Sequence, residues 1–99
     1  MYGLHGTLRA KPGQRDALLA LLRGSSGGEP MPGCRLYVVS ELPAEPDAID
    51  VFEVWDDKAA HHASLQLDRV RETIAKARPL IAGMGESVEL RPVGGQGLD

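Results

Sequence analysis

The chain has 99 residues, 42% of them hydrophobic and 25% charged, with a net charge of −3, which predicts one globular domain over residues 1–99. It has no basic cluster and no apolar run near the ~20 residues of a membrane span, so binding to nucleic acid and insertion into a membrane are both disfavoured. Its one cysteine, Cys34, excludes an intramolecular disulfide and fits the cytoplasm, and the N-terminus lacks the features of a signal peptide.

The first third of the chain predicts a strand, a helix and a loop. Residues 2–10 alternate apolar and polar side chains with a period of two, which indicates a strand. Residues 14–23 carry leucines three and four apart, which indicates an amphipathic helix, with Gly24 after its end. Residues 25–33 are rich in Gly, Ser and Pro and predict a loop.

Two strands are predicted next, at residues 34–42 and 48–55. The connection at residues 43–47 carries two prolines and is short enough for an antiparallel hairpin. On the second strand Phe52 and Val54 share one face, and the other face contains Ile49, Val51, Glu53 and Trp55. Both faces are largely apolar, so both are expected to be covered.

Residues 58–82 predict helix with a break. The first piece covers residues 58–65, and Asp56 or Asp57 is expected to cap it. The second piece begins near Asp68, a second candidate cap, and carries an apolar stripe made of Leu67, Val70, Ile74, Ala77 and Ile81. Pro79 predicts a kink or an early end to this helix.

The C-terminal region predicts a helix stop, a strand and a tail. Gly83-Met84-Gly85 is the expected stop, and residues 86–93 form the last strand with Val88 and Leu90 inward. Residues 93–99 are rich in glycine and predict a flexible tail.

The predicted order is strand, helix, strand, strand, helix, strand. Connection rules turn this order into an α+β, ferredoxin-like fold, in which a four-stranded antiparallel sheet carries its helices on one face. The other face of the sheet would be open although it is apolar, so we expect a homodimer that packs sheet to sheet.

The junction between the strand at residues 48–55 and the following helix is the predicted site. It contains the only Trp, Trp55, and two of the three histidines, His61 and His62. The Trp55 side chain is either a core anchor or a donor whose indole N–H binds a substrate oxygen or a developing peroxide. Neighbouring helical residues point about 100° apart, so only one histidine should face the pocket as a general base.

Other polar residues are candidates for binding a substrate. Glu53 shares a strand face with Trp55 and is expected either at the site or in an ion pair with Arg35 or Arg78. His5 is expected at the pocket or at the dimer seam, and Tyr37 in the core, at the interface or at the site. Two adjacent histidines do not form a zinc ligand set, so no metal is expected.

Several segments together resemble one known family. They are Glu53-Val-Trp-Asp-Asp-Lys-Ala-Ala-His61-His-Ala-Ser-Leu, Val70-Arg-Glu-Thr-Ile-Ala-Lys-Ala-Arg78-Pro-Leu-Ile, Lys11-Pro-Gly-Gln and Met31-Pro-Gly-Cys34. This set is similar to the antibiotic biosynthesis monooxygenase domain family. The resemblance implies a dimeric α+β barrel that oxidises a small, electron-rich quinol, phenol or anthrone with O₂, without metal or flavin. Other members degrade haem with an Asn, a Trp and a His, but this chain contains no Asn.

The resemblance and the residue chemistry together define the predicted site. Trp55 and His61 are the expected catalytic residues, with His61 favoured over its neighbour because it fits the family pattern better. The expected substrate-binding residues are Glu53, Tyr37, His5 and His62. The alternative function is a non-catalytic small-molecule-binding module, or an isomerase, on the same dimeric barrel.

Overall fold

The computed structural model describes residues 1–24 and 31–98. Its elements in chain order are β1 (Tyr2–Ala10), α1 (Arg15–Arg23), β2 (Cys34–Leu42), β3 (Glu45–Trp55), α2 (Lys58–Ser64), α3 (Asp68–Ala77), the 3₁₀ turn η1 (Arg78–Leu80) and β4 (Ile81–Leu90). Of the predicted loop at residues 25–33, residues 25–30 lie outside the described part. None of the helices in the described ranges has the length and apolar character needed to span a bilayer.

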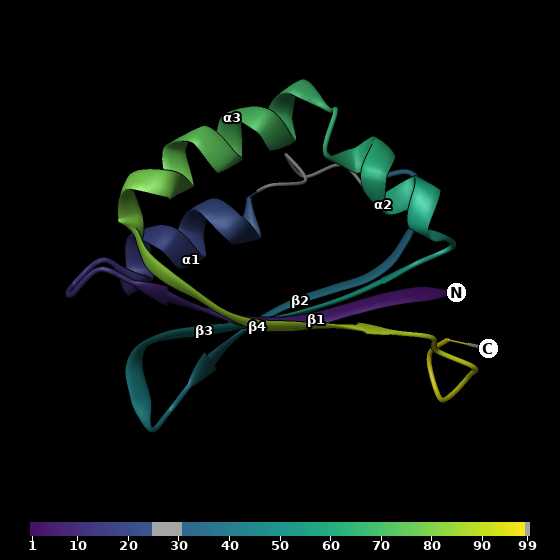
Figure 1. Cartoon of the computed structure of the whole chain (residues 1–99), viewed down its shortest axis with the longest axis horizontal. Coiled ribbons are helices and arrows are strands. Elements are labelled where there is room, and N and C mark those ends of the chain that lie inside the picture. Colours follow the sequence, from purple (N-terminus) through teal and green to yellow (C-terminus); the bar gives the residue numbers. More distant parts are fainter. Residues whose placement is uncertain (25–30, 99) are drawn as a thin grey trace.

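The four strands form one antiparallel sheet in the order β2-β3-β1-β4. The helices lie on one side of this sheet, as Figure 1 shows. The α+β, ferredoxin-like arrangement predicted from the element order is therefore confirmed.

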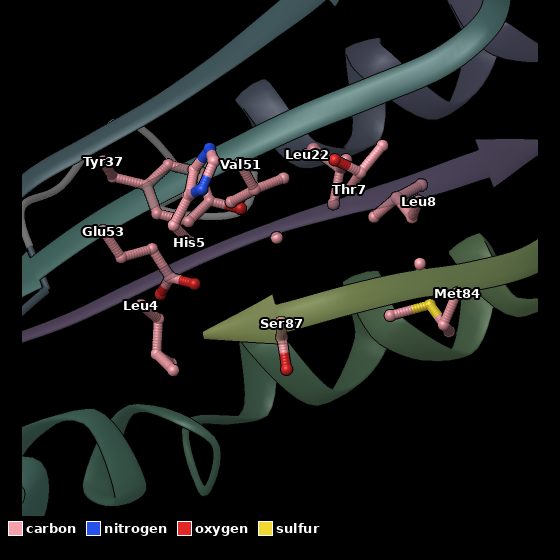
Figure 2. Close-up of a pocket in the computed structure, with 12 residues that line it drawn as sticks. Leu4, His5, Thr7, Leu8, Leu22, Tyr37, Val51, Glu53, Met84 and Ser87 are labelled. Atoms are coloured by element: carbon pink, nitrogen blue, oxygen red, sulfur yellow. The ribbon is translucent and has the colours of Figure 1, made fainter. Parts of the chain in front are cut away.

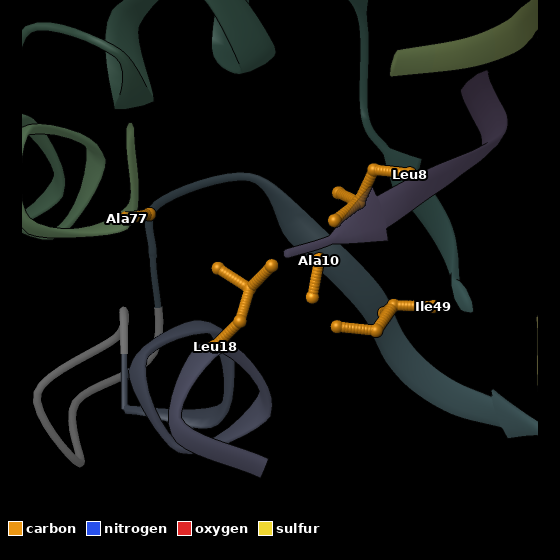
Figure 3. Close-up of a cluster of buried hydrophobic side chains, with 5 residues drawn as sticks. All are labelled: Leu8, Ala10, Leu18, Ile49 and Ala77. Atoms are coloured by element: carbon orange, nitrogen blue, oxygen red, sulfur yellow. The ribbon is translucent and has the colours of Figure 1, made fainter. Parts of the chain in front are cut away.

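The pairing register decides which side chains face the helices. β1 and β3 place Leu4 opposite Glu53 and Leu8 opposite Ile49, and side chains alternate between the two faces along each strand. The helix-facing side chains near one end of the sheet, Leu8, Ala10 and Ile49, pack with Leu18 of α1 and Ala77 of α3 in the main core (Figure 3). Burying each of the larger apolar side chains contributes roughly 1.5–3 kcal/mol.

A second cluster lies at the other end of the same face. It consists of Met31, Trp55 and Val70, and Trp55 is only 1% exposed. The two clusters anchor the helices at both ends of the sheet.

The β2–β3 hairpin is tighter than predicted. β3 begins at Glu45, so the turn covers residues 43–44 rather than 43–47. Pro46 is tolerated inside the strand because β1 pairs with β3 only from Ala48 onward, which leaves the position of Pro46 without a partner on that side.

The prediction for the C-terminal region was wrong in its boundaries. The helix ends at Ala77, Pro79 sits in η1, and β4 already begins at Ile81, so Gly83-Met84-Gly85 lies within a strand. Pro79 cannot continue the helix, and β1 then provides a partner for the chain that follows. Gly85 suits this pairing because a Cβ there would lie 2.7 Å from the carbonyl oxygen of Thr7.

The caps of the two later helices differ from each other. Asp57 caps α2, where its carboxylate accepts from the backbone N–H of Ala60 at 2.7 Å. The prediction that Asp68 caps α3 was wrong. Leu67 holds the cap position without a side-chain hydrogen bond, and Asp68 is the first residue of α3. There its charge still suits the helix dipole.

The open face, meaning the side of the sheet away from the helices, is partly apolar. The exposed fractions of Val38, Val88 and Leu90 are 40%, 50% and 42%. Val88 and Leu90 were predicted to face inward, but in the single chain they lie on the open face. β4 also ends at Leu90 rather than at Val93. Val88 is paired with His5 across the strands, which places both on this face.

The chain after β4 turns onto the side opposite the helices (Figure 1). Pro92 lies against Gly3, where a Cβ on the glycine would be 3.2 Å from the proline ring. The backbone N–H of Leu98 donates to the carbonyl of Gly95 at 3.0 Å and closes a turn. The flexibility of this tail stays a prediction.

Candidate active site

Three adjoining cavities lie between the helices and the sheet. The smallest, of about 140 Å³, is bounded by Glu53, Trp55 and His61, and we call it the His61 cavity. The sheet cavity, of about 320 Å³, runs along β1, and the outer cavity, of about 470 Å³, lies between α3 and β4. Leu22 of α1 lines all three, so together they form one hollow of mainly apolar walls.

Figure 2 shows the sheet cavity, with Tyr37 and Glu53 at one end and Met84 at the other. Tyr37 and Glu53 also line the His61 cavity, so these two residues join the polar end of the hollow to its apolar length. Met84 also lines the outer cavity. A ligand can therefore place a reacting group at the polar end and an apolar body along the sheet.

The polar end is built by three side chains from β3 and α2. The indole N–H of Trp55 donates to Glu53 Oε1 at 3.2 Å, which is possible because residues two apart on a strand share a face. His61 Nε2 lies 3.9 Å from the same oxygen. The His61 and Glu53 side chains are only 14% and 17% exposed, so these contacts form largely out of water.

Burial shifts the protonation of both titratable groups toward the neutral form. It raises the pKa of the Glu53 carboxyl, while the Trp55 N–H binds the ionised form and opposes the rise. Burial also lowers the pKa of His61, and the nearby charges of His62 and Lys58 lower it further. A carboxylate at 3.9 Å favours the imidazolium, but burial outweighs it and the pKa of His61 lies below its ordinary value of 6.5. The imidazole is therefore mainly neutral at neutral pH.

The second ring nitrogen of His61 is also informative. Among the described residues, the buried Nδ1 atom has no hydrogen-bond partner. A buried polar atom without a partner costs free energy, and such an atom at a cavity is a natural contact for a ligand or a water molecule. The imidazole can therefore exchange a proton with a bound molecule.

Of the two adjacent histidines, α2 turns only His61 toward the hollow. His61 lines the smallest cavity, whereas His62 is exposed and lines none of the three. His62 is therefore not placed to bind a substrate in this hollow, although its ring centre lies 5.8 Å from that of His61.

The remaining predicted residues divide between the two faces. Tyr37 lies at the site, as described above. His5 is among the residues that line the sheet cavity, but its imidazole lies on the open face, where Nε2 is 2.9 Å from Asp50 Oδ1. The alternative of an ion pair between Glu53 and Arg35 or Arg78 is wrong for the described residues. Arg35 Nε donates to Asp56 at 2.6 Å, and the Glu53 carboxylate contacts Trp55 and His61 instead.

Sequence reasoning missed most of the apolar wall. Leu22, Met31, Thr73, Ile74 and Met84 all line the hollow. Leu22 and Ile74 lay on predicted helix stripes and carried a signal for burial, but nothing in the pattern separated a core position from a cavity wall. Among the described residues, no three His, Cys, Asp or Glu side chains are grouped to hold a metal ion.

The family model described as antibiotic biosynthesis monooxygenase matches residues 1–76. The chain belongs to the antibiotic biosynthesis monooxygenase family. The match ends before β4, so the strand that completes the sheet comes from the structure rather than from the family model.

Solved structures support the same assignment. A protein from Chloroflexus aurantiacus J-10-fl, described as a candidate antibiotic biosynthesis monooxygenase, is 52% identical, with 99% of this chain and 98% of that chain covered and a TM-score of 0.93. A protein from Deinococcus radiodurans with the same description is 28% identical over 96% of this chain and 95% of that one, with a TM-score of 0.79. A comparison with curated proteins finds no significant match.

One more distant neighbour shares the fold alone. Rv0793 from Mycobacterium tuberculosis is 20% identical, with 96% of this chain and 97% of that chain covered and a TM-score of 0.80. The sheet and helices are thus common to the antibiotic biosynthesis monooxygenase family and its structural neighbours, and function must be argued from the side chains at the site.

Proposed function

We propose that this antibiotic biosynthesis monooxygenase family member oxidises a small, electron-rich aromatic substrate, of the quinol, phenol or anthrone type, with O₂. The observation that carries the proposal is the largely buried imidazole of His61, 3.9 Å from Glu53 at the polar end of an apolar hollow, where burial lowers its pKa. Such a hollow suits an aromatic ring, and a neutral imidazole suits proton removal near neutral pH.

The reaction can be written as a balanced sequence. His61 removes a proton from an acidic C–H or O–H group of the substrate, and the resulting anion transfers one electron to O₂. The substrate radical and superoxide combine to form a carbon–oxygen bond, and the imidazolium of His61 returns the proton to the peroxide. In an anthrone, loss of water leaves a new carbonyl, so one oxygen atom enters the product and the other enters water.

The proposed role of Trp55 differs from the one predicted for it. Its indole N–H is the only donor on the side chain and is already bonded to Glu53. We therefore propose that Trp55 orients the Glu53 carboxylate, and that the imidazolium of His61 stabilises the developing peroxide charge. Glu53 would in turn stabilise that imidazolium, because an opposite charge nearby favours the charged form.

The proposal is tested by following product formation and O₂ uptake with a panel of quinols, phenols and anthrones. We expect one O₂ consumed per product, and a rate well above that of the same substrate without protein. Equal product formation in anaerobic and aerobic incubations would overturn the proposal. Thermal stabilisation by the panel without O₂ uptake would instead favour a binding module.

We also propose that two copies pack through their open faces and that the protein works in the cytoplasm. The partly exposed Val38, Val88 and Leu90 support the first point, since an apolar sheet face is expected to be covered. The single cysteine supports the second.

A further inference from the structure

The imidazole of His61 lies between two aromatic rings from different strands. Trp55, at the end of β3, meets it edge-on with ring centres 5.5 Å apart. Tyr2, at the start of β1, lies at a tilted angle with ring centres 5.8 Å apart. The sheet register pairs Tyr2 directly with Trp55. Trp55 lines the His61 cavity, and Tyr2 packs against the cluster that contains Trp55, just outside that cavity. The proposed reaction uses Trp55 through Glu53 but gives Tyr2 no part.

Two charged side chains hold Tyr2. Burial and the neighbouring Glu89 carboxylate of β4 raise the pKa of its hydroxyl. Glu89 Oε2 also lies 3.4 Å from Lys58 Nζ, and Lys58 Nζ lies 5.9 Å from the centre of the Tyr2 ring, within the range of a cation–π contact. Each contact alone is weak at an exposed site, but together they connect β1, α2 and β4 around one ring.

These contacts also act on the helix that carries His61. Lys58 and His61 are three residues apart on α2 and therefore share a face, and both meet the Tyr2 ring. α2 has only seven residues, and so short a helix depends on tertiary contacts for its stability. The orientation of the imidazole thus depends on what packs against this face.

We propose that Tyr2 is a positioning residue for His61. Its ring fixes the imidazole toward Glu53 and keeps water from that end of the hollow, and Lys58 and Glu89 hold Tyr2 in place. The effect on the reaction rate rests on the proposed function, whereas the effect on the imidazole can be measured without any substrate.

The first experiment is an NMR titration of the His61 imidazole in the wild type, Tyr2→Phe and Tyr2→Ala. The charged groups near His61, namely Glu53, Lys58, His62 and Glu89, are the same in all three proteins. We expect Tyr2→Ala to move the pKa of His61 upward toward its ordinary value, because water then reaches the ring. Tyr2→Phe keeps the aromatic ring and should therefore shift the pKa of His61 much less.

A second pair of variants keeps the test decisive if Tyr2→Ala does not fold. Glu89→Gln removes the charge that holds Lys58, and Glu86→Gln removes an exposed charge from the same strand. We expect the NMR titration of the His61 imidazole to change in Glu89→Gln and to stay the same as in the wild type in Glu86→Gln. An unchanged His61 titration in a folded Tyr2→Ala protein, or failing that in Glu89→Gln, would overturn the proposal.

The rate separates this proposal from the proposed function. With an oxidised substrate in hand, Tyr2→Ala should lower kcat by on the order of 10-fold to 10²-fold, because small displacements of a catalytic group cost that much, and should leave KM nearly unchanged. A wild type that turns nothing over would defeat the proposed function while the titration still decides the role of Tyr2. If the wild type turns over a substrate but the His61 titration is unchanged in Tyr2→Ala, only the proposed role of Tyr2 is refuted.

Discussion

His61 and His62 are adjacent residues with the same chemistry and different surroundings. His61 faces the hollow, and His62 faces solvent. We expect His61→Ala to lower kcat/KM by roughly 10²- to 10⁴-fold, the usual contribution of a positioned acid–base group. His62→Ala serves as the matched control and should stay near the wild-type value. Wild-type turnover in His61→Ala, measured by O₂ uptake, would remove His61 from the mechanism.

The lowered pKa of His61 predicts a pH-dependent stability. Just below the ordinary value of 6.5, the unfolded chain binds a proton at this residue and the folded protein does not, so stability falls as the pH drops through the folded-state pKa. Urea unfolding at pH 7 and pH 5 should therefore show a smaller loss on acidification in His61→Gln than in the wild type. His62→Gln should reduce the loss less than His61→Gln does, because it removes only one of the causes that lower the pKa of His61. Equal losses in all three proteins would contradict the assignment.

At the scale of elements, two glycines with the same backbone conformation give a matched pair. Gly13 and Gly33 have φ of 78° and 79°, a region that side chains rarely adopt. A Cβ on Gly13 would meet nothing within 4 Å, whereas one on Gly33 would lie 2.6 Å from the Cβ of Ala60 on α2. Gly13→Ala should lower the free energy of unfolding only by the conformational strain, roughly 1 kcal/mol. Gly33→Ala should lower it clearly more, because the new methyl group also collides with Ala60.

The same pair also reports on the site, since Ala60 directly precedes His61. Displacement of α2 by Gly33→Ala should lower activity, while Gly13→Ala should leave it close to that of the wild type. Thermal unfolding and O₂ uptake of both variants check the two expectations. Equal stability of the two variants would show that α2 adjusts without cost.

The elements differ in how far the sequence pattern could predict them. Period-two alternation gave β1 correctly, because the two faces of the sheet differ in polarity there, and the faces of β3 followed from the alternation of side chains along any strand. Gly83-Met84-Gly85 suggested a helix stop because glycine is common there, but β1 supplies a partner that local pattern does not reveal. The contact of Tyr2 with His61 could not be foreseen, since it depends on the β1–β3 register and on the orientation of α2.

At the scale of the whole molecule, the open face predicts the oligomeric state. Val88 is half exposed on this face, so Val88→Lys would place a charge in the proposed sheet-to-sheet contact, where an unpaired charge is costly. We expect a wild-type dimer and a Val88→Lys monomer by sedimentation velocity at micromolar concentration. Ala75→Lys, which adds the same charge on an exposed position of α3, should remain a dimer. A wild type that sediments as single chains would refute the dimer.

The pairing of β1 with β4 has a consequence for biosynthesis. This ladder joins residues that are far apart in the sequence, with Gly3 opposite Leu90, and contacts between such distant residues form slowly because a long loop must close first. During translation β1 therefore waits for β4, which is synthesised about 70 residues later. A nascent chain that stops before Ile81 leaves one side of β1 unpaired, and an unpaired strand edge can pair with other chains. Glu89 lies on the same late strand, so we expect the contacts around Tyr2 to form only after β4 has been synthesised and has paired with β1.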